Sequence, residues 1–165
     1  MAIKDKRTEI QEEEIQDIEL AVAKKTKFRI NGDNNCIIEL NTSDLGIAGR
    51  LSDAYPKLLD YVKDAQKQVD AISEADEDSL GKFADMLRDI DKKMRDLVDY
   101  IFNSPVADKC AKDGTMYDPY EGEFRFEVII SKLVKLYSNN LDTEFAKMKD
   151  KVSKHTNKYT KKYHK

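Results

Sequence analysis

The sequence lacks the features that carry a protein into or across a membrane. In 165 residues the longest unbroken apolar run is four residues, from Leu20 to Ala23, whereas a helix that spans a bilayer needs about 20 apolar residues. The N-terminal segment, residues 1–7, is charged and has no apolar core of the kind found in secretory signals. We therefore expect a protein that has no membrane partner and acts in the cytoplasm.

Residues that hold metals or act as nucleophiles are also scarce. The two cysteines, Cys36 and Cys110, lie far apart in the chain, and the two histidines, His155 and His164, lie near its C-terminal end. In a reducing cytosol we expect the cysteines to be free thiols in or near the core. No Gly-rich phosphate loop, G-x-S-x-G or H-E-x-x-H motif is present. We expect a protein that is not an enzyme and needs no metal or other cofactor.

Two apolar stripes with helical spacing form the strongest pattern in the chain. In each stripe, apolar residues recur three or four positions apart, which places them along one side of a helix. One stripe comprises Leu51, Tyr55, Leu58, Val62, Ala65, Val69 and Ile72, and the other Leu80, Phe83, Leu87, Ile90, Met94, Leu97 and Ile101. The short polar link 73–79 between them predicts an antiparallel helical hairpin. The stripes face either the core of this protein or a second chain.

The residues before the stripes predict a β-hairpin and a less certain helix. Residues 27–30 and 36–40 have the composition of strands, and the loop between them is rich in Asn and Gly. For residues 8–25 we favour a helix, because Thr8 can cap it and acidic residues follow. Apolar residues at 18, 20 and 22 also alternate as in a strand, so the helix is expected to give way to a strand near Leu20.

Further boundaries follow from capping residues and prolines. A helix is expected to begin within 41–47, and Pro56 either kinks this helix or separates it from a second one, with a kink or tight break in one line of helix preferred. The second stripe should end at 103–105. An irregular loop of about 18 residues is expected near 106–122, packed against the body by its aromatic residues. A helix is predicted over 124–139, followed by a narrower stripe to Tyr163.

The C-terminal segment differs in charge from the rest of the chain. Residues 147–165 contain eight lysines and one acidic residue, whereas residues 1–146 contain 21 basic and 31 acidic residues. The segment is therefore a solubilising helix end, a site for an acidic protein surface, or a site for nucleic acid. The candidate partner-binding residues are the apolar stripe and the lysines beside it, Phe145, Met148, Val152, Tyr159, Tyr163, Lys151, Lys154 and Lys158.

The order of these features resembles the small tail-assembly chaperones encoded by long-tailed phages and prophages of Firmicutes. The resemblance covers about residues 26–140 and rests on the β-hairpin, the helix start 41–45, the Tyr55-Pro56-Lys57-Leu58 step, the helix end 97–103 and the loop end 122–127. It implies a mostly helical, self-associating protein that holds the long helical tape-measure protein until the tail tube grows around it. The basic end after Lys147 does not match the pattern shared by the family.

These observations together predict an α+β, helix-dominated fold, in which a small β-hairpin packs on an antiparallel helical hairpin and two C-terminal helices. Residues 1–146 would form a single mainly helical domain with an N-terminal arm, and residues 147–165 a basic, partly helical tail. The expected function is that of a phage tail-assembly chaperone in the cytoplasm of the bacterial host, working as a homo-oligomer. The alternatives are another phage or prophage component that stays in the virion, and a nucleic-acid-binding accessory protein that uses the Lys-rich tail.

Overall fold

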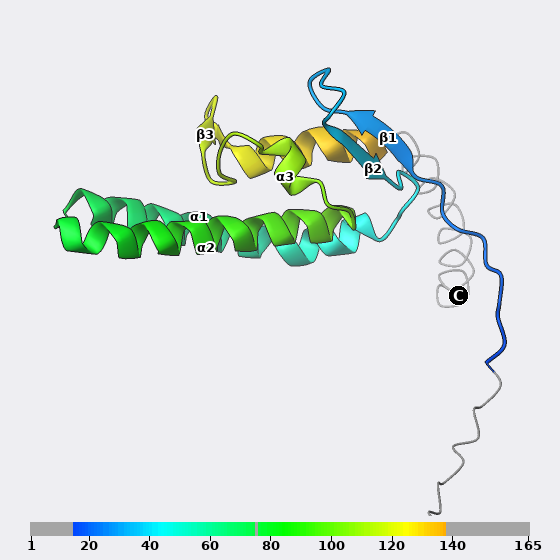
Figure 1. The fold of residues 1–165 in the computed structure, drawn as a ribbon, viewed down its shortest axis with the longest axis horizontal. Coiled ribbons are helices and arrows are strands. Elements are labelled where there is room, and N and C mark those ends of the chain that lie inside the picture. Colours follow the sequence, from blue (N-terminus) through cyan, green and yellow to red (C-terminus); the bar gives the residue numbers. More distant parts are fainter. Residues whose placement is uncertain (1–14, 75, 138–165) are drawn as a thin grey trace, which may run out of the picture.

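The computed structural model describes residues 15–74 and 76–137 and confirms the predicted fold class. Its elements are, in chain order, β1 (Thr26–Arg29), β2 (Ile37–Leu40), α1 (Ile47–Ser73), α2 (Glu77–Phe102), α3 (Ala107–Cys110), β3 (Pro119–Tyr120), β4 (Glu123–Phe124) and a helix over residues 125–137. Figure 1 shows two layers: the long α1–α2 hairpin forms one, and all the other elements lie on one side of it. The hairpin extends beyond the second layer at the end where α1 passes into α2.

The α1–α2 hairpin has the helical spacing that its sequence predicts, but α1 begins after Gly46 without a cap from a side chain. Helix α1 continues through Pro56 from Ile47 to Ser73, so the single line of helix is confirmed, whereas a tight break at Pro56 is wrong. The side chain of Asp76 caps α2 by accepting a hydrogen bond from the backbone N–H of Ser79 at 3.0 Å. Asn103 ends α2 in the left-handed conformation, with φ of 47°.

The β-hairpin also follows the prediction. Strands β1 and β2 pair antiparallel, with Phe28 opposite Ile38 and Lys27 opposite Glu39. Asn31 and Gly32 turn the chain with φ of 50° and 72°, which asparagine and glycine tolerate better than other residues. One face of this small sheet packs into the core through two buried residues of β2, Ile38 and Leu40, and two half-buried residues, Phe28 and Ile30.

The helix over residues 125–137 closes the core, as its apolar pattern predicts. Its buried residues are Phe126, Ile129, Ile130, Leu133 and Tyr137. The ring of Phe126 lies 6.1 Å from that of Tyr55 on α1, and the hydroxyl of Tyr55 donates a hydrogen bond to Glu127 at 2.9 Å. The start of this helix is therefore tied to the middle of α1 by both apolar and polar contacts.

The segment between α2 and this last helix is more ordered than predicted. It contains the single turn α3 and the two-residue strands β3 and β4, which turn through Glu121 and Gly122 at φ of 50° and 86°. Met116 is fully buried and Tyr117 half-buried, so the expected packing against the body is correct for them. The same expectation is wrong for Tyr120, which is exposed on the β3–β4 turn.

The helix predicted at the N-terminal end is wrong for the part that the structure describes. Residues 15–25 form neither helix nor strand, and their large apolar side chains are exposed. No described element packs against them, so an amphipathic helix would have no surface on which to bury its apolar face. Residues 8–14, the second C-terminal helix, the boundary at residue 146 and the basic tail lie outside the described residues.

Candidate functional site

The free end of the α1–α2 hairpin exposes apolar residues that the rest of the hairpin buries. The last buried residue of α1 is Ala65, and the first of α2 is Ile90. Two helices alone cannot enclose the apolar stripes between them, and beyond these residues no third element of the described chain covers the seam. We define the hairpin tip by its half-buried or exposed apolar residues in this stretch, Val69, Ile72, Leu80, Phe83 and Met86.

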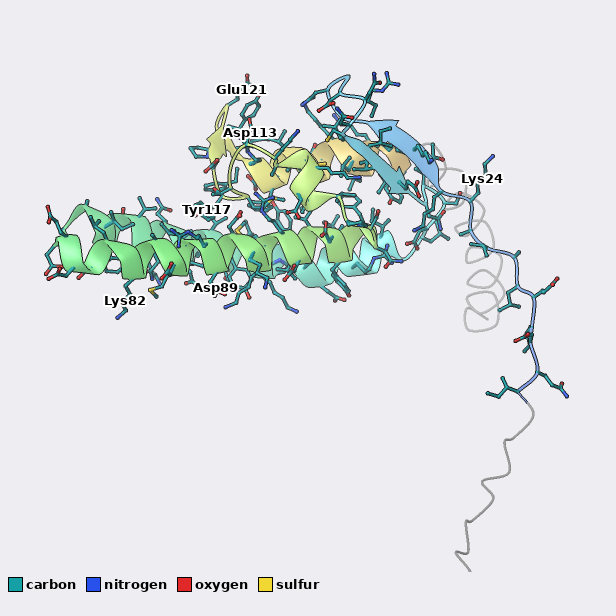
Figure 2. The ribbon with its side chains drawn as sticks, in the orientation of Figure 1. Lys24, Lys82, Asp89, Asp113, Tyr117 and Glu121 are labelled. Carbon is teal, nitrogen blue, oxygen red and sulfur yellow. The ribbon has the colours of Figure 1, made fainter. Side chains whose placement is uncertain are left out.

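The surface around the hairpin tip is acidic. Residues 66–89 carry seven acidic side chains against three basic ones. The acidic residues include the N-terminal cap of α2, Asp76, and the two that follow it, Glu77 and Asp78, whose negative charges suit the positive end of the helix dipole. Figure 2 shows Lys82 and Asp89 pointing away from the second layer. The tip can therefore offer an apolar seam with an acidic border to another helix.

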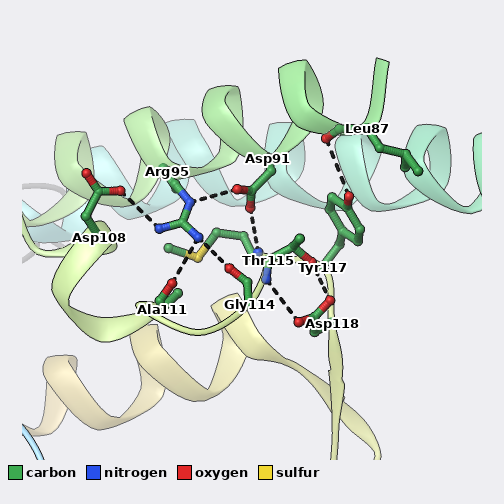
Figure 3. A network of polar contacts seen from close by, with 10 residues as sticks. Leu87, Asp91, Arg95, Asp108, Ala111, Gly114, Thr115, Tyr117 and Asp118 are labelled. Carbon is green, nitrogen blue, oxygen red and sulfur yellow. Dashed lines mark hydrogen bonds and ion pairs between the residues drawn. The ribbon is translucent and has the colours of Figure 1, made fainter. Parts of the chain in front are cut away.

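An arginine-centred network fixes the second layer onto α2 (Figure 3). The guanidinium of Arg95 pairs with Asp91 at 2.8 Å and with Asp108 at 3.0 Å. It also donates hydrogen bonds to the backbone carbonyls of Ala111, at 3.0 Å, and Gly114, at 2.6 Å. A planar group with five donors can hold several acceptors at once, which a lysine cannot do. One side chain thus joins α2, α3 and the loop after α3.

Asp91 and Tyr117 extend this network along α2. The second oxygen of Asp91 accepts a hydrogen bond from the backbone N–H of Met116 at 2.7 Å, and Tyr117 donates to the carbonyl of Leu87 at 3.4 Å. Burial opposes the charge of Arg95, but its hydrogen bonds and ion pairs with Asp91 and Asp108 outweigh this, so the pKa of Arg95 is raised. The second layer is held at Leu87 and beyond, which leaves the tip free of it.

A second carboxylate, Asp99, anchors the start of α3. It accepts hydrogen bonds from the backbone N–H groups of Val106 and Ala107, both at 2.8 Å. Burial raises the pKa of Asp99 above 3.8, although the two hydrogen bonds act in the opposite direction. Since the folded-state pKa is the higher one, the Asp99 contribution to stability is complete below pH 3.8. It is lost as the pH rises through the folded-state pKa.

We expect the asparagine variant of this residue to separate its charge from its acceptor role. Asp99→Asn keeps an oxygen for both N–H groups, so its stability relative to the wild type should increase as the pH rises from 3.8 to 7. Asp99→Ala should cost about 1–3 kcal/mol at both pH values, because it leaves the N–H of fully buried Ala107 without an acceptor. Urea unfolding of the three proteins at pH 4 and pH 7 measures both effects. Equal losses in the two variants would contradict this account.

The described residues contain no cluster of metal ligands, and their two cysteines are unreactive in character. Within 15–74 and 76–137, no three His, Cys, Asp or Glu side chains lie together as metal ligands would. Cys36 is buried and donates to the carbonyl of Lys109 at 3.2 Å, and Cys110 is half-buried; both are free thiols, as predicted. Burial, with the nearby Cys36 and Asp99, raises the pKa of Cys110 to about 11, so its thiol is protonated and weakly nucleophilic at pH 7.

The partner-binding residues predicted from the sequence cannot be placed. All eight belong to residues 138–165, outside the described part of the chain. The two apolar stripes predicted from the sequence include most residues of the hairpin tip. The spacing of apolar residues does not show, however, at which residue a stripe stops being buried. The ion pair between Asp91 and Arg95 could have been predicted from the sequence, because acidic and basic residues four positions apart on a helix form ion pairs. Their contacts with the loop after α3 depend on the tertiary structure.

Comparisons of the chain with protein-family models, with curated proteins and with solved structures find no match. In the described part of the chain, no helix has the length and apolar character needed to cross a bilayer.

Proposed function

We propose that this protein is a non-enzymatic tail-assembly chaperone of a long-tailed phage or prophage of Firmicutes. It would act in the cytoplasm of the bacterial host and hold a tape-measure-like helical protein during tail assembly. The resemblance over residues 26–140 supports the family, and the hairpin tip is the observation that carries the mechanism. Apolar residues of the tip stay exposed at fractions of 40–50%, as in Val69, Leu80 and Met86.

In this mechanism the client supplies the third helix that the tip lacks. A client helix would lie along the seam between α1 and α2 and bury its own apolar stripe there, as amphipathic helices do in apolar recognition sites. The acidic border of the tip favours client segments with Lys or Arg beside the stripe. The partner-binding residues predicted in the tail, such as Tyr159 and Lys158, would form a second contact with acidic client segments.

The experiment measures binding of client helices to the full-length protein. The chaperone proposal predicts a long, heptad-rich reading frame beside the gene, and overlapping peptides from its product are the probes. The double variant Val69→Ser, Leu80→Ser should weaken binding at least about tenfold, because each residue loses apolar area buried by the client. Its thermal midpoint should stay near the wild-type value, since both side chains are already 42–50% exposed.

Matched controls are available on other exposed surfaces. Tyr100 and Tyr120 are exposed at 46% and 51% and lie outside the tip, so Tyr100→Ser and Tyr120→Ser should bind as the wild type does. Equal binding by the tip variant and the wild type would refute the seam mechanism. A chaperone should also be missing from finished particles, whereas mass spectrometry that detects it there would favour a virion component.

The nucleic-acid alternative predicts a different result in a binding experiment of the same design. Replacing Lys151, Lys154 and Lys158 with glutamine would abolish binding to a DNA or RNA probe, and that binding would weaken steeply with added salt. The tip variant would leave it unchanged. Tight nucleic-acid binding together with no peptide binding would replace the chaperone proposal.

A further inference from the structure

The large apolar side chains of the segment before β1 are more fully exposed than those of any described helix. Ile15, Ile18, Leu20 and Val22 are exposed at 90%, 80%, 79% and 92%. Single exposed apolar residues are ordinary on a protein surface, but four within eight residues of one segment are not. We call residues 15–22 the arm; Figure 2 shows the side chains before β1 standing clear of the body.

The arm has the alternation of a strand along most of its length. Ile18, Leu20 and Val22 would lie on one face of such a strand, with Asp17 and Glu19 on the other. A lone strand is not stable in water, because its backbone groups and apolar face need a partner. The arm therefore has the composition of a strand that pairs with a sheet edge.

The β1–β2 sheet offers one such edge. The N–H of Ile30 donates a hydrogen bond to the carbonyl of Cys36, and in an antiparallel pair every second residue makes such bonds. Phe28 therefore bonds to Ile38, whereas the backbone groups of Lys27 and Arg29 point outward from β1. No described residue hydrogen-bonds to these outward groups or pairs with this side of β1.

The opposite edge of the sheet is covered. On β2 the outward carbonyls of Ile37 and Glu39 accept hydrogen bonds from the Lys109 ammonium and, at 2.7 Å, from the Ser104 hydroxyl. Side chains from the turn after α2 and from α3 thus occupy the acceptors that an added strand would use. Within residues 15–74 and 76–137, one edge of the sheet is thus blocked and the other is available for pairing.

The side chains of the arm and those of β1 are complementary on both faces of the sheet that the two strands would form. In the register that places Ile18, Leu20 and Val22 beside the half-buried Phe28 and Ile30, the acidic residues of the arm lie on the same side as Lys27 and Arg29. Opposite charges across neighbouring strands are favourable, and the other register would bury the acidic residues.

The surface beside the free edge of β1 carries positive charge, although the chain as a whole is acidic. Arg29, Arg125 and Lys132 line a hollow of about 440 Å³ between the end of β1 and the last helix. Asp113 pairs with Arg125 there, while Arg29 and Lys132 have no acidic partner among the described residues. Uncompensated cations at this place favour the approach of an acidic strand.

We propose that the arm of one copy adds as a third strand to the free edge of β1 in a second copy. The arm cannot readily reach the edge of its own β1. It leads directly into that strand through residues 20–27, which contain no glycine, proline or asparagine to reverse the chain. Figure 1 shows the segment running away from the sheet. Reciprocal use of two arms closes a dimer, and this exchange is independent of client binding at the tip.

The test is the self-association of the full-length protein, measured by sedimentation equilibrium without a client. The arm variant Ile18→Asp, Leu20→Asp should weaken association at least about tenfold, because it removes the apolar face of the added strand. The matched double variant at the tip, Val69→Asp with Leu80→Asp, should associate as the wild type does. Lys27→Pro removes an outward N–H of β1 and should also weaken association, whereas Lys27→Ala keeps that N–H and should weaken it much less.

Charge exchange keeps the test valid if the proline disturbs the hairpin. Asp17→Lys with Glu19→Lys, and Lys27→Glu with Arg29→Glu, should each weaken association, and the four changes together should restore it. A mixture of the arm variant with Lys27→Pro should associate more strongly than either variant alone, because the intact arm of one can pair with the intact edge of the other and restore one of the two exchanges. A strictly monomeric wild type up to millimolar concentration, normal association of the arm variant, or no restoration by charge exchange would each overturn the proposal.

Discussion

Arg95→Ala should lower the free energy of unfolding by about 3 kcal/mol, the lower end of the range for breaking a buried ion pair. The Arg95 side chain is 18% exposed and Asp91 is 17% exposed, so little water can replace the lost partner. The substitution would leave the Asp91 carboxylate without its cation. It would also leave the carbonyls of Ala111 and Gly114 without their donor. The loop after α3 should then separate from α2 before the hairpin unfolds.

The matched control is Arg88, about two helical turns earlier on α2. Arg88 pairs with Asp85, and both side chains are 75% exposed, so Arg88→Ala should change stability by less than about 0.5 kcal/mol. Arg95→Lys should fall between the two, since it keeps the charge but loses the planar fork. Urea unfolding gives the free energies, and hydrogen exchange at Met116 reports local opening. Equal effects at Arg88 and Arg95 would show that the network does not hold the two layers together.

Leu58→Ala should destabilise the protein by about 2–5 kcal/mol, as expected when a fully buried leucine is truncated. Leu58 has no exposed surface and belongs to the core formed by α1, α2 and the last helix. The cavity left by the substitution would lie between the two layers, where neither helix of the hairpin can move without breaking the other contacts.

Its neighbour Leu59 is the control, because it has the same chemistry and the same helix but points outward with 36% of its surface exposed. We expect Leu59→Ala to cost less than about 1 kcal/mol. Thermal and urea unfolding of the two variants should therefore differ clearly. If Leu59→Ala proved the more damaging, α1 would be rotated relative to the arrangement described, and the hairpin tip would be defined by other residues.

Local patterns in the sequence were sufficient for the two long helices and the β-hairpin. Their signals need only near neighbours: apolar residues three or four apart, and Asn31 and Gly32 in a turn. The arm shows the limit of such patterns. Its residues are compatible with both a helix and a strand, and without a packing surface in the described part of the chain neither forms.

Burial along the stripes was decided by the tertiary structure. Leu58 and Val69 occupy equivalent places in one stripe, yet the first is fully buried and the second is 50% exposed. The difference arises because the second layer covers only part of the hairpin, and Arg95 determines where that layer attaches by binding segments 13 to 19 positions away. Which edge of the sheet is blocked likewise depends on Lys109 and Ser104, more than 60 positions from their acceptors. By itself, therefore, the sequence determined the helices and strands through short-range spacing, whereas contacts between distant residues decided which apolar residues and backbone groups remain free to bind another chain.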